Sequence, residues 1–372
     1  MATVMTEKAP RRDYLKVVGG TVGGLVVGVV GGYFAGLASA PKAPAAAAGP
    51  PISIGVIGKS VHPYWAVVDA GRKAAGDELG IDTSFFVPAK EDVPKQISTV
   101  EDYIVAKKSG IAFAPSDPAA SASVIAKGLD AGIPLITIDT DAPDSRRLAY
   151  LGTNNLEAGR TAGRTFLEGL SKMGISPSGA KVGIGVGSVT AMNAIERIQG
   201  FKEVVEAAGA KTLEPVNDKE DPVAALSLAS SVLAANPDLV GAFGVYAYNG
   251  PAWARAVREG GKAGKILIVE FDATKENIDP IKEGTIYATV AQRQYFQGYL
   301  AVKLLYNMNV YGYYLADKAK GWETALKAFV SGYPTNKIYD TGTDVITKAT
   351  LKQYYDAQIA LGIPPDVIGW SP

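Results

Sequence analysis

The chain of 372 residues contains no cysteine and a single histidine, His62. The absence of cysteine excludes disulfide bonds, thiolate catalysis, zinc–thiolate sites and a lipid-modified N-terminal cysteine. One histidine leaves almost nothing from which to build a histidine-based metal site or a Ser-His-Asp triad. We therefore expect no metal site and no other cofactor.

The chain also lacks an excess of charge, because 37 basic side chains are balanced by 37 acidic ones. Nucleic-acid binding normally requires a basic face, so we expect no nucleic-acid partner. The glycine-rich run Gly183-Ile-Gly-Val-Gly187 lacks the G-x-G-x-x-G spacing of a dinucleotide site. With 47% hydrophobic residues and roughly 150 residues per domain, the chain is long enough for two ordinary cores.

Residues 1–50 differ in character from the rest and indicate an export signal. Arg11-Arg12 followed by Tyr-Leu-Lys resembles the twin-arginine motif, and residues 17–40 form an uncharged apolar run. Ala38-Ser-Ala40 fits a cleavage site, although Pro41 is unfavourable directly after it. The run is also about long enough to span a bilayer, so a cleaved signal and a retained anchor both stay open.

An Ala/Pro-rich tether, Pro41 to Pro51, separates this segment from the folded part. The basic residues lie before the apolar run and are expected on the cytoplasmic side. The folded part is therefore expected outside the cytoplasmic membrane, in the periplasm or at the cell surface.

From residue 51 onward, apolar strand patterns alternate with helical patterns, as in parallel sheets with crossover helices. The expected strands are 52–57, 83–87, 111–114, 135–138, 148–151, 181–186, 211–215, 239–245, 265–271 and 285–290, with a last strand within 338–347. The expected helices are 64–79, 93–107, 119–131, 194–208, 222–235, 251–259 and 349–361, with further helices starting near Asn155, Gln292 and Trp322.

The two halves of this pattern resemble each other. The strand that begins at Ile52 matches the one that begins at Lys181, and a late strand in each half ends at an aspartate, Asp139 and Asp272. In open α/β sheets, ligands bind at the carboxyl ends of the strands. The sequence therefore predicts an α/β fold of two doubly wound parallel-sheet lobes that face one cleft.

Three crossings between the lobes are expected, near Gly152–Asn155, at Val290–Arg293 and within 338–347. They divide the chain into an N-terminal lobe of residues 51–153 with 292–338 and a C-terminal lobe of residues 154–291 with 339–372.

Five motifs in this order resemble those of the periplasmic sugar-binding proteins typified by ribose-binding protein, the type I receptors of ABC importers. They are His62-Pro-Tyr-Trp65, Leu135-Ile-Thr-Ile-Asp139, Arg197-Ile-Gln-Gly-Phe201, Phe271-Asp272 and Val290-Ala-Gln292. The resemblance covers about residues 52 to 347. It implies two lobes joined by a three-crossover hinge and closure on a monosaccharide or polyol, which is handed to a membrane permease. It also implies a monomer that binds its ligand without catalysis.

Sugar recognition has a clear chemical basis. Aromatic rings stack on the C–H faces of a sugar, and carboxylates, amides and guanidinium groups bind its hydroxyls in pairs. On this basis and on the resemblance, the candidate ligand-binding residues are His62, Tyr64, Trp65, Asp139, Asp141, Asn193, Arg197, Tyr246, Asn249, Asp272 and Gln292.

Several of these candidates have a structural alternative. One aromatic of the Tyr64-Trp65 pair could belong to the core, Asp141 could cap the following turn, and Gln292 could brace the hinge. His62 could be an ordinary loop residue, Asp272 could cap a following helix, and Arg197 could lie on a helix surface.

The chain also departs from the ribose receptors. Ala114, Thr140 and His62 stand where those proteins have asparagine, arginine and asparagine, which favours a ligand other than ribose.

Three other functions stay open. The same fold could bind a non-sugar polar metabolite. Asp139 and Asp272 could serve an exported glycosidase. A sugar-responsive regulator would require an N-terminal DNA-binding domain. This chain has its export segment at that position, which makes this function the least favoured.

Overall fold

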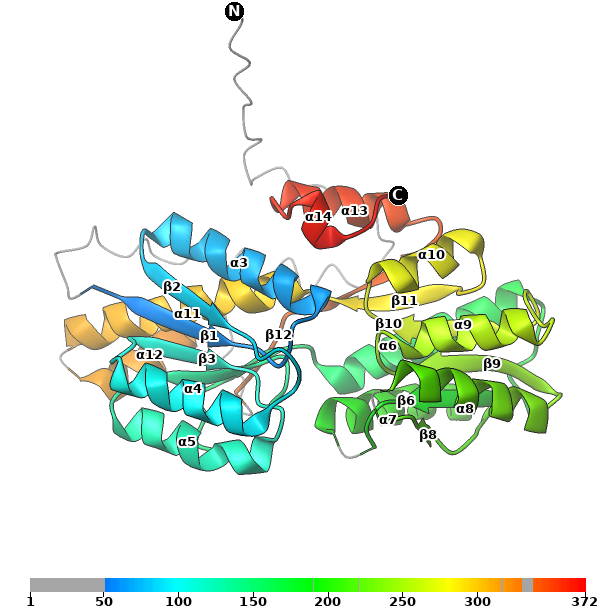
Figure 1. Cartoon of the computed structure of the whole chain (residues 1–372), viewed down its shortest axis with the longest axis horizontal. Helices are drawn as coiled ribbons and strands as arrows, with labels where there is room; N and C mark the ends of the chain where they lie inside the picture. The colour runs from blue at the N-terminus through cyan, green and yellow to red at the C-terminus, as the bar shows by residue number, and fades with distance from the viewer. Residues whose placement is uncertain (1–50, 190, 220, 316, 330–336) are drawn as a thin grey trace, which may run out of the picture.

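The computed structural model describes residues 51–189, 191–219, 221–315, 317–329 and 337–372. The export segment and tether predicted for residues 1–50 lie outside these residues. The described chain forms two α/β lobes side by side (Figure 1). None of its helices combines the length and the apolar character needed to span a lipid bilayer.

The first lobe contains a six-stranded sheet formed within the described residues. Its elements are β1 Ser53–Ile57, α3 Pro63–Leu79, β2 Asp82–Phe86, α4 Val93–Val105, β3 Gly110–Phe113, α5 Pro118–Asp130, β4 Leu135–Ile138, β5 Tyr150–Gly152, α11 Gln294–Leu315, α12 Lys318–Phe329 and β12 Ile338–Asp340. The strand order is β12-β5-β4-β3-β1-β2, and all neighbours are parallel.

The second lobe contains a sheet of seven described strands. Its elements are α6 Asn155–Lys172, β6 Lys181–Val186, α7 Met192–Ala207, β7 Lys211–Thr212, β8 Val216–Asn217, α8 Pro222–Ala235, β9 Leu239–Gly244, α9 Asn249–Glu259, β10 Leu267–Phe271, α10 Lys275–Glu283, β11 Ala288–Gln292, β13 Thr343–Thr347, α13 Leu351–Ala360 and α14 Pro365–Ile368. The strand order is β13-β11-β10-β9-β6-β7, and β8 also pairs with β6.

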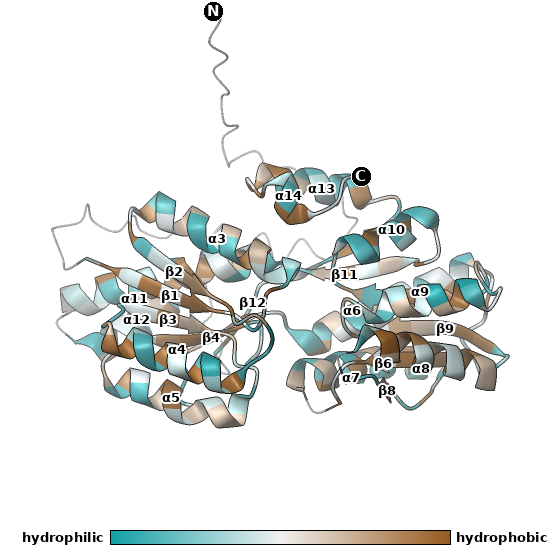
Figure 2. Ribbon diagram, viewed as in Figure 1, coloured by the Kyte–Doolittle hydropathy of each residue, from teal (hydrophilic) through white to brown (hydrophobic). Residues whose placement is uncertain are grey.

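The strands are the most apolar part of each lobe. β3, β4, β10 and β11 are buried along their whole length, and Figure 2 shows strands of both sheets in brown between helices that carry hydrophilic residues. Such continuous apolar strands are typical of parallel sheets with helices on both faces.

Local signals set the starts of several helices. α4, α5 and α8 each begin with an aspartate cap and a proline in the first turn; the caps are Asp92, Asp117 and Asp221. Each cap side chain accepts a backbone N–H that has no partner within the helix, and proline has no N–H to leave unpaired there.

The helix pairs α3–α11 and α6–α7 pack closely through glycines. A Cβ atom on Gly71 or Gly298 would collide with a backbone oxygen of the facing helix in the first pair, and one on Gly159 or Gly200 would do so in the second. The two lobes therefore use the same packing device, which fixes α7 against α6.

The expected α/β alternation and the parallel sheets are confirmed, with local differences. The strand expected at 211–215 is shortened to β7 at 211–212, a separate short strand, β8, follows at 216–217, and the strand expected at 285–290 spans 288–292. β13 runs antiparallel to β11. Only two residues separate it from β12, which runs toward the lobe junction. β13 therefore leads away from the junction, against the direction of the parallel strands. A helix after Asp272 was considered only as an alternative role for that residue; it forms as α10, and its cap is Thr274 and not Asp272. The helix α14 was not predicted.

Within the described residues, the chain passes between the lobes at 152–155, at 292–294 and at 340–343. In Figure 1, the orange helices α11 and α12 return to the blue and cyan lobe, and the red helices α13 and α14 lie over the junction. The carboxyl ends of β4 and β10 both reach this junction.

Candidate ligand-binding site

Two strands, one from each lobe, end at an aspartate with left-handed backbone. Asp139 follows β4 with φ 60°, and Asp272 follows β10 with φ 73°. A positive φ is uncommon for a residue with a side chain, although aspartate tolerates it better than most. Strained backbone of this kind is concentrated at functional sites. Lys107, Lys219 and Lys337 share this backbone conformation, but Asp139 and Asp272 are the two such residues that directly follow a parallel strand at the lobe junction.

Asp139 is surrounded by donors from the first lobe. Its carboxylate lies 3.1 Å from Lys59 Nζ and accepts a hydrogen bond of 3.0 Å from Thr140 Oγ1. Burial would raise the pKa of Asp139. The Lys59 ammonium and the hydrogen bonds from Tyr64, Lys59 and Thr140 outweigh it, so the pKa lies below its usual value. Asp139 is thus a stably ionised acceptor.

Asp272 has fewer positive neighbours. Gln292 Nε2 donates to its Oδ1 at 2.9 Å, and only 7% of the residue is exposed. Burial raises the pKa of Asp272 above its usual value, although the charge of Arg197 and the bond from Gln292 act in the opposite direction. The two carboxylates thus differ: Asp139 holds its charge, and Asp272 takes up a proton more readily.

Arg197 lies beneath the second lobe's part of the site. Its guanidinium stacks 4.2 Å from the ring centre of Phe271, and 2% of the residue is exposed. Nε donates to Asn155 Oδ1 at 3.0 Å, and Nη1 donates to the Val245 carbonyl at 3.1 Å. Arg197 is therefore a buried, oriented cation and not a surface arginine.

Gln292 joins two of the crossings to the carboxylate of Asp272. Its Oε1 accepts from Thr153 Oγ1 at 2.9 Å while its Nε2 donates to Asp272. Thr153 belongs to the first crossing and Gln292 to the second. The side chain braces the hinge and at the same time orients a candidate ligand contact.

The aromatic pair at the start of α3 is divided between the site and the core. Trp65 is 4% exposed, belongs to the hydrophobic core and lies so close to Gly58 that a Cβ atom there would collide with its ring. Tyr64 is half-buried, and its hydroxyl lies 3.0 Å from Gln297 Oε1. Burial and the charges of Asp139 and Asp272 raise the pKa of Tyr64 well above its usual value, and Tyr64 lines the same interlobe cavity as Asp272. Tyr64 faces the site, whereas Trp65 lies in the core.

The Tyr64 hydroxyl has two acceptors within reach, Gln297 and Asp139. Gln297 Nε2 is buried without a partner. If the Gln297 amide presents its NH₂ group to the Tyr64 oxygen, that NH₂ group gains a partner and the phenol proton is free for Asp139.

His62 is exposed and caps α3. Its Nδ1 accepts from the Tyr64 backbone N–H at 3.2 Å, as in the neutral form of the ring. A cavity of about 40 Å³ lies here between the lobes. Its lining includes His62 and Tyr64 from the first lobe and Asp272 from the second.

The other predicted residues are engaged locally. Asp141 forms a two-point ion pair with Arg147, at 2.7 and 2.5 Å, and accepts from Thr137 and from the Ala142 backbone. The structure thus shows the turn-shaping role that was the alternative for Asp141.

Asn249 is 1% exposed and sits between Asp218 and the backbone N–H of Tyr246. It braces the loop that carries Tyr246, whose hydroxyl lies 3.3 Å from Asn193 Oδ1. The loop thus brings Tyr246 and Asn193 together at the start of α7.

Sequence reasoning missed several residues that complete the site, namely Lys59, Asn155 and Gln297. Lys59 follows β1 as Asp139 follows β4, so its place at a strand end was a usable signal. Asn155 and Gln297 lie in the first turn of the helices that follow the first and second crossings, where polar side chains can face the junction. Among the described residues, no group of acidic or histidine side chains could hold a metal ion.

The comparisons with known proteins agree with this architecture. The model of the periplasmic binding protein domain matches residues 54–310. The ribose import binding protein of Haemophilus influenzae is 27% identical over 241 residues, which cover 65% of this chain and 80% of that protein.

Two solved structures are similar over most of the chain. An ABC transporter solute-binding protein from Burkholderia graminis, in complex with D-arabinose, is 32% identical with a TM-score of 0.70, covering 82% of this chain and 97% of that one. GanP, a glucose-galactose binding protein from Geobacillus stearothermophilus, is 29% identical with a TM-score of 0.69, covering 82% and 99%. These relatives are binding proteins, and the chain belongs to the periplasmic binding protein domain family.

Proposed function

We propose that this protein is the solute-binding component of an ABC importer and that it captures a monosaccharide or a related polyol between its lobes by hinge closure. The observation that carries the proposal is the pair of strand-end aspartates, one from each lobe, with a cation near each. Asp139 has Lys59, and Asp272 has Arg197.

This group of side chains suits a neutral ligand with several hydroxyls. An ionised carboxylate accepts two hydroxyl protons, an ammonium and a guanidinium donate to oxygens, and an amide does both. Tyr64 and Tyr246 add half-buried aromatic rings. Because the groups come from both lobes, a ligand that bridges them binds the closed form better and shifts the hinge toward closure.

The remaining features follow from the same proposal. The protein acts as a monomer outside the cytoplasmic membrane, delivers its ligand to a membrane permease, and performs no catalysis on it. It engages no nucleic acid. The lobe bounds expected from the sequence shift by one or two residues, because β11 keeps Gln292 in the second sheet and β12 extends the first sheet to Asp340. The N-terminal lobe is therefore assigned residues 51–153 with 293–340, and the C-terminal lobe residues 154–292 with 341–372. Residues 1–50 direct export and either are removed or keep the protein at the membrane through residues 17–40.

A thermal-shift screen of the purified protein tests the proposal. The panel contains ribose, allose, arabinose, xylose, glucose, galactose, tagatose, several polyols and non-sugar polar metabolites. A ligand at 100 times its dissociation constant adds about 2.7 kcal/mol of stability, which raises the melting temperature measurably.

Asp139→Asn should remove the shift, because an amide cannot accept a hydroxyl proton at both positions. Asp144→Asn, at an exposed position in the following turn, is the matched control and should keep it. A shift only with a non-sugar metabolite would refute the choice of ligand. A full shift in Asp139→Asn would refute the site.

A further inference from the structure

The last residues of the chain, 361–372, form a packed segment that we call the C-terminal strap. They lie outside the residues 54–310 that match the family model. The strap nevertheless buries three apolar side chains, Ile363, Ile368 and Trp370, which are 1%, 8% and 6% exposed. Figure 1 shows α14, which belongs to the strap, at the junction of the lobes, near α3 and α10. This segment is part of the fold and not a trailing end.

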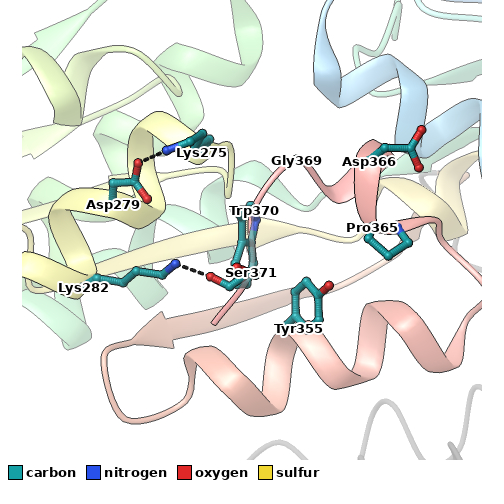
Figure 3. A pocket seen from close by; sticks show the side chains of 9 residues that line it. All are labelled: Lys275, Asp279, Lys282, Tyr355, Pro365, Asp366, Gly369, Trp370 and Ser371. Atoms are coloured by element: carbon teal, nitrogen blue, oxygen red, sulfur yellow. Dashed lines mark hydrogen bonds and ion pairs between the residues drawn. The ribbon is translucent and has the colours of Figure 1, made fainter.

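The strap is attached to the second lobe through Trp370. The indole Nε1 donates a hydrogen bond of 2.9 Å to the carbonyl of Ala273. Tyr354 stacks on the ring at 6.2 Å, and Tyr355 packs beside it at 5.3 Å. Lys282 also donates to the Ser371 carbonyl. Trp370, Ser371, Lys282 and Tyr355 line a surface hollow of about 590 Å³. Figure 3 shows Trp370 between Tyr355 and the helix that carries Lys282.

The strap also reaches the first lobe. α14 packs against α3. The cavity of about 40 Å³ beside the ligand site is lined by Val367, Ile368 and Trp370 of the strap together with Val67 of α3. The lining also includes Tyr64 and Asp272, the candidate ligand contacts from the two lobes. A single segment therefore contacts both lobes on one side of the ligand site.

The attachment point lies next to the strained turn at Asp272. Ala273, whose carbonyl accepts the Trp370 bond, directly follows the residue with φ 73°. A left-handed aspartate persists only where its surroundings hold it. Trp370 and Gln292 thus fix this turn from two sides, one through the backbone and the other through the carboxylate.

We propose that the C-terminal strap is a built-in clamp on ligand binding, with Trp370 as a positioning residue for Asp272. It forms a third wall of the interlobe site and holds the lobes in the arrangement in which Tyr64 and Asp272 lie close together. This inference rests on the proposed function for its ligand, but the clamp itself is a property of the ligand-free protein.

Two strap variants each break one attachment of the strap. Trp370→Phe keeps an aromatic ring but removes the donor to Ala273. Val367→Asp places a charge where α14 meets α3. The matched control is Val223→Asp, which adds the same charge at a valine of the second lobe that is 77% exposed. Should Val367→Asp fail to fold, Trp370→Phe still carries the test.

The lobe arrangement is measured directly, because a chain without cysteine can be labelled at chosen positions. Val105→Cys on α4 and Ser230→Cys on α8 are exposed positions, one on each lobe, for a fluorophore pair. In the ligand-free protein, both strap variants should change the energy transfer between the labels, while Val223→Asp should not.

Affinity is then measured for the sugar that gives the largest thermal shift with the wild-type protein. Val367→Asp should weaken binding about tenfold, because burial of one valine side chain is lost, and Trp370→Phe about fivefold, for one hydrogen bond. Unchanged energy transfer and affinity in both variants would overturn the clamp, and so would tighter binding. If no sugar binds the wild-type protein, the proposed function fails, and the energy transfer alone still decides on the clamp.

Discussion

Glu270 offers a test of the electrostatics of the second lobe. It lies on β10, two residues before Asp272, and is completely buried. Oε2 accepts from Asn277 Nδ2 at 2.7 Å, whereas Oε1 has no partner. Burial raises the pKa of Glu270 well above its usual value; the bond from Asn277 opposes the shift, and the charge of Asp272 adds to it. We predict that Glu270 is protonated in the folded protein, in contrast to Asp139.

The predicted effect on stability has a defined sign. Above about pH 4.3 the unfolded chain releases this proton, while the folded protein keeps it until its own higher pKa is reached. Over this window the folded state binds more protons, so the free energy of unfolding falls by about 1.4 kcal/mol per pH unit from this residue. Glu270→Gln removes the titration and keeps an acceptor for Asn277. The stability of the variant relative to wild type should therefore rise with pH.

Urea unfolding at pH 5, 6, 7 and 8 measures this difference. Taking the variant minus the wild type largely cancels the titration of the other groups. Glu276→Gln, at an exposed position on α10, controls for loss of a charge and should give no comparable slope. If the difference between Glu270→Gln and wild type is independent of pH from 5 to 8, Glu270 is ionised in the fold and the reasoning is wrong.

Two further predictions concern the packing and the hinge. Gly200→Ala should destabilise the protein by about 1–3 kcal/mol and weaken ligand binding, because a Cβ there collides with the Leu156 carbonyl and displaces α7, which carries Arg197. Gly312→Ala is the control, because its Cβ would meet nothing closer than 3.6 Å. If both variants lower the melting temperature equally, displacement of α7 is not the cause of the loss. Thr153→Val should lower the free energy of unfolding by about 1–3 kcal/mol, because the buried Gln292 oxygen loses its donor. The control is Thr341→Val, because the Thr341 hydroxyl is buried without a partner and its removal should cost little stability. If both variants lower the free energy of unfolding in urea by a similar amount, the Thr153–Gln292 hydrogen bond is unimportant.

The sequence predicted the fold and the two central carboxylates for a local reason. A buried strand has a recognisable run of apolar residues, and the residue that follows it must lie at the sheet edge where ligands bind. This reasoning found Asp139 and Asp272. It would also have found Lys59, which occupies the same kind of position after β1.

Pairs of similar neighbours show where the sequence was insufficient. Tyr64 and Trp65 are adjacent aromatics, but successive helical residues point about 100° apart, so one faces the site and the other the core. Asp139 and Asp141 follow the same strand, yet Arg147 holds Asp141 within its own turn. Which residue faces the candidate site depends on how the helix and the turn pack against the rest of the lobe.

The sequence by itself determined the alternation of elements, the three crossings and the strand ends that carry charge, because each depends on neighbours along the chain. Only the tertiary structure decided which groups form hydrogen bonds and ion pairs with each other. Lys59 meets Asp139 across 80 positions, Thr153 meets Gln292 across 139, and Trp370 meets Ala273 across 97. Such contacts form when distant segments pack together, and no local pattern records them.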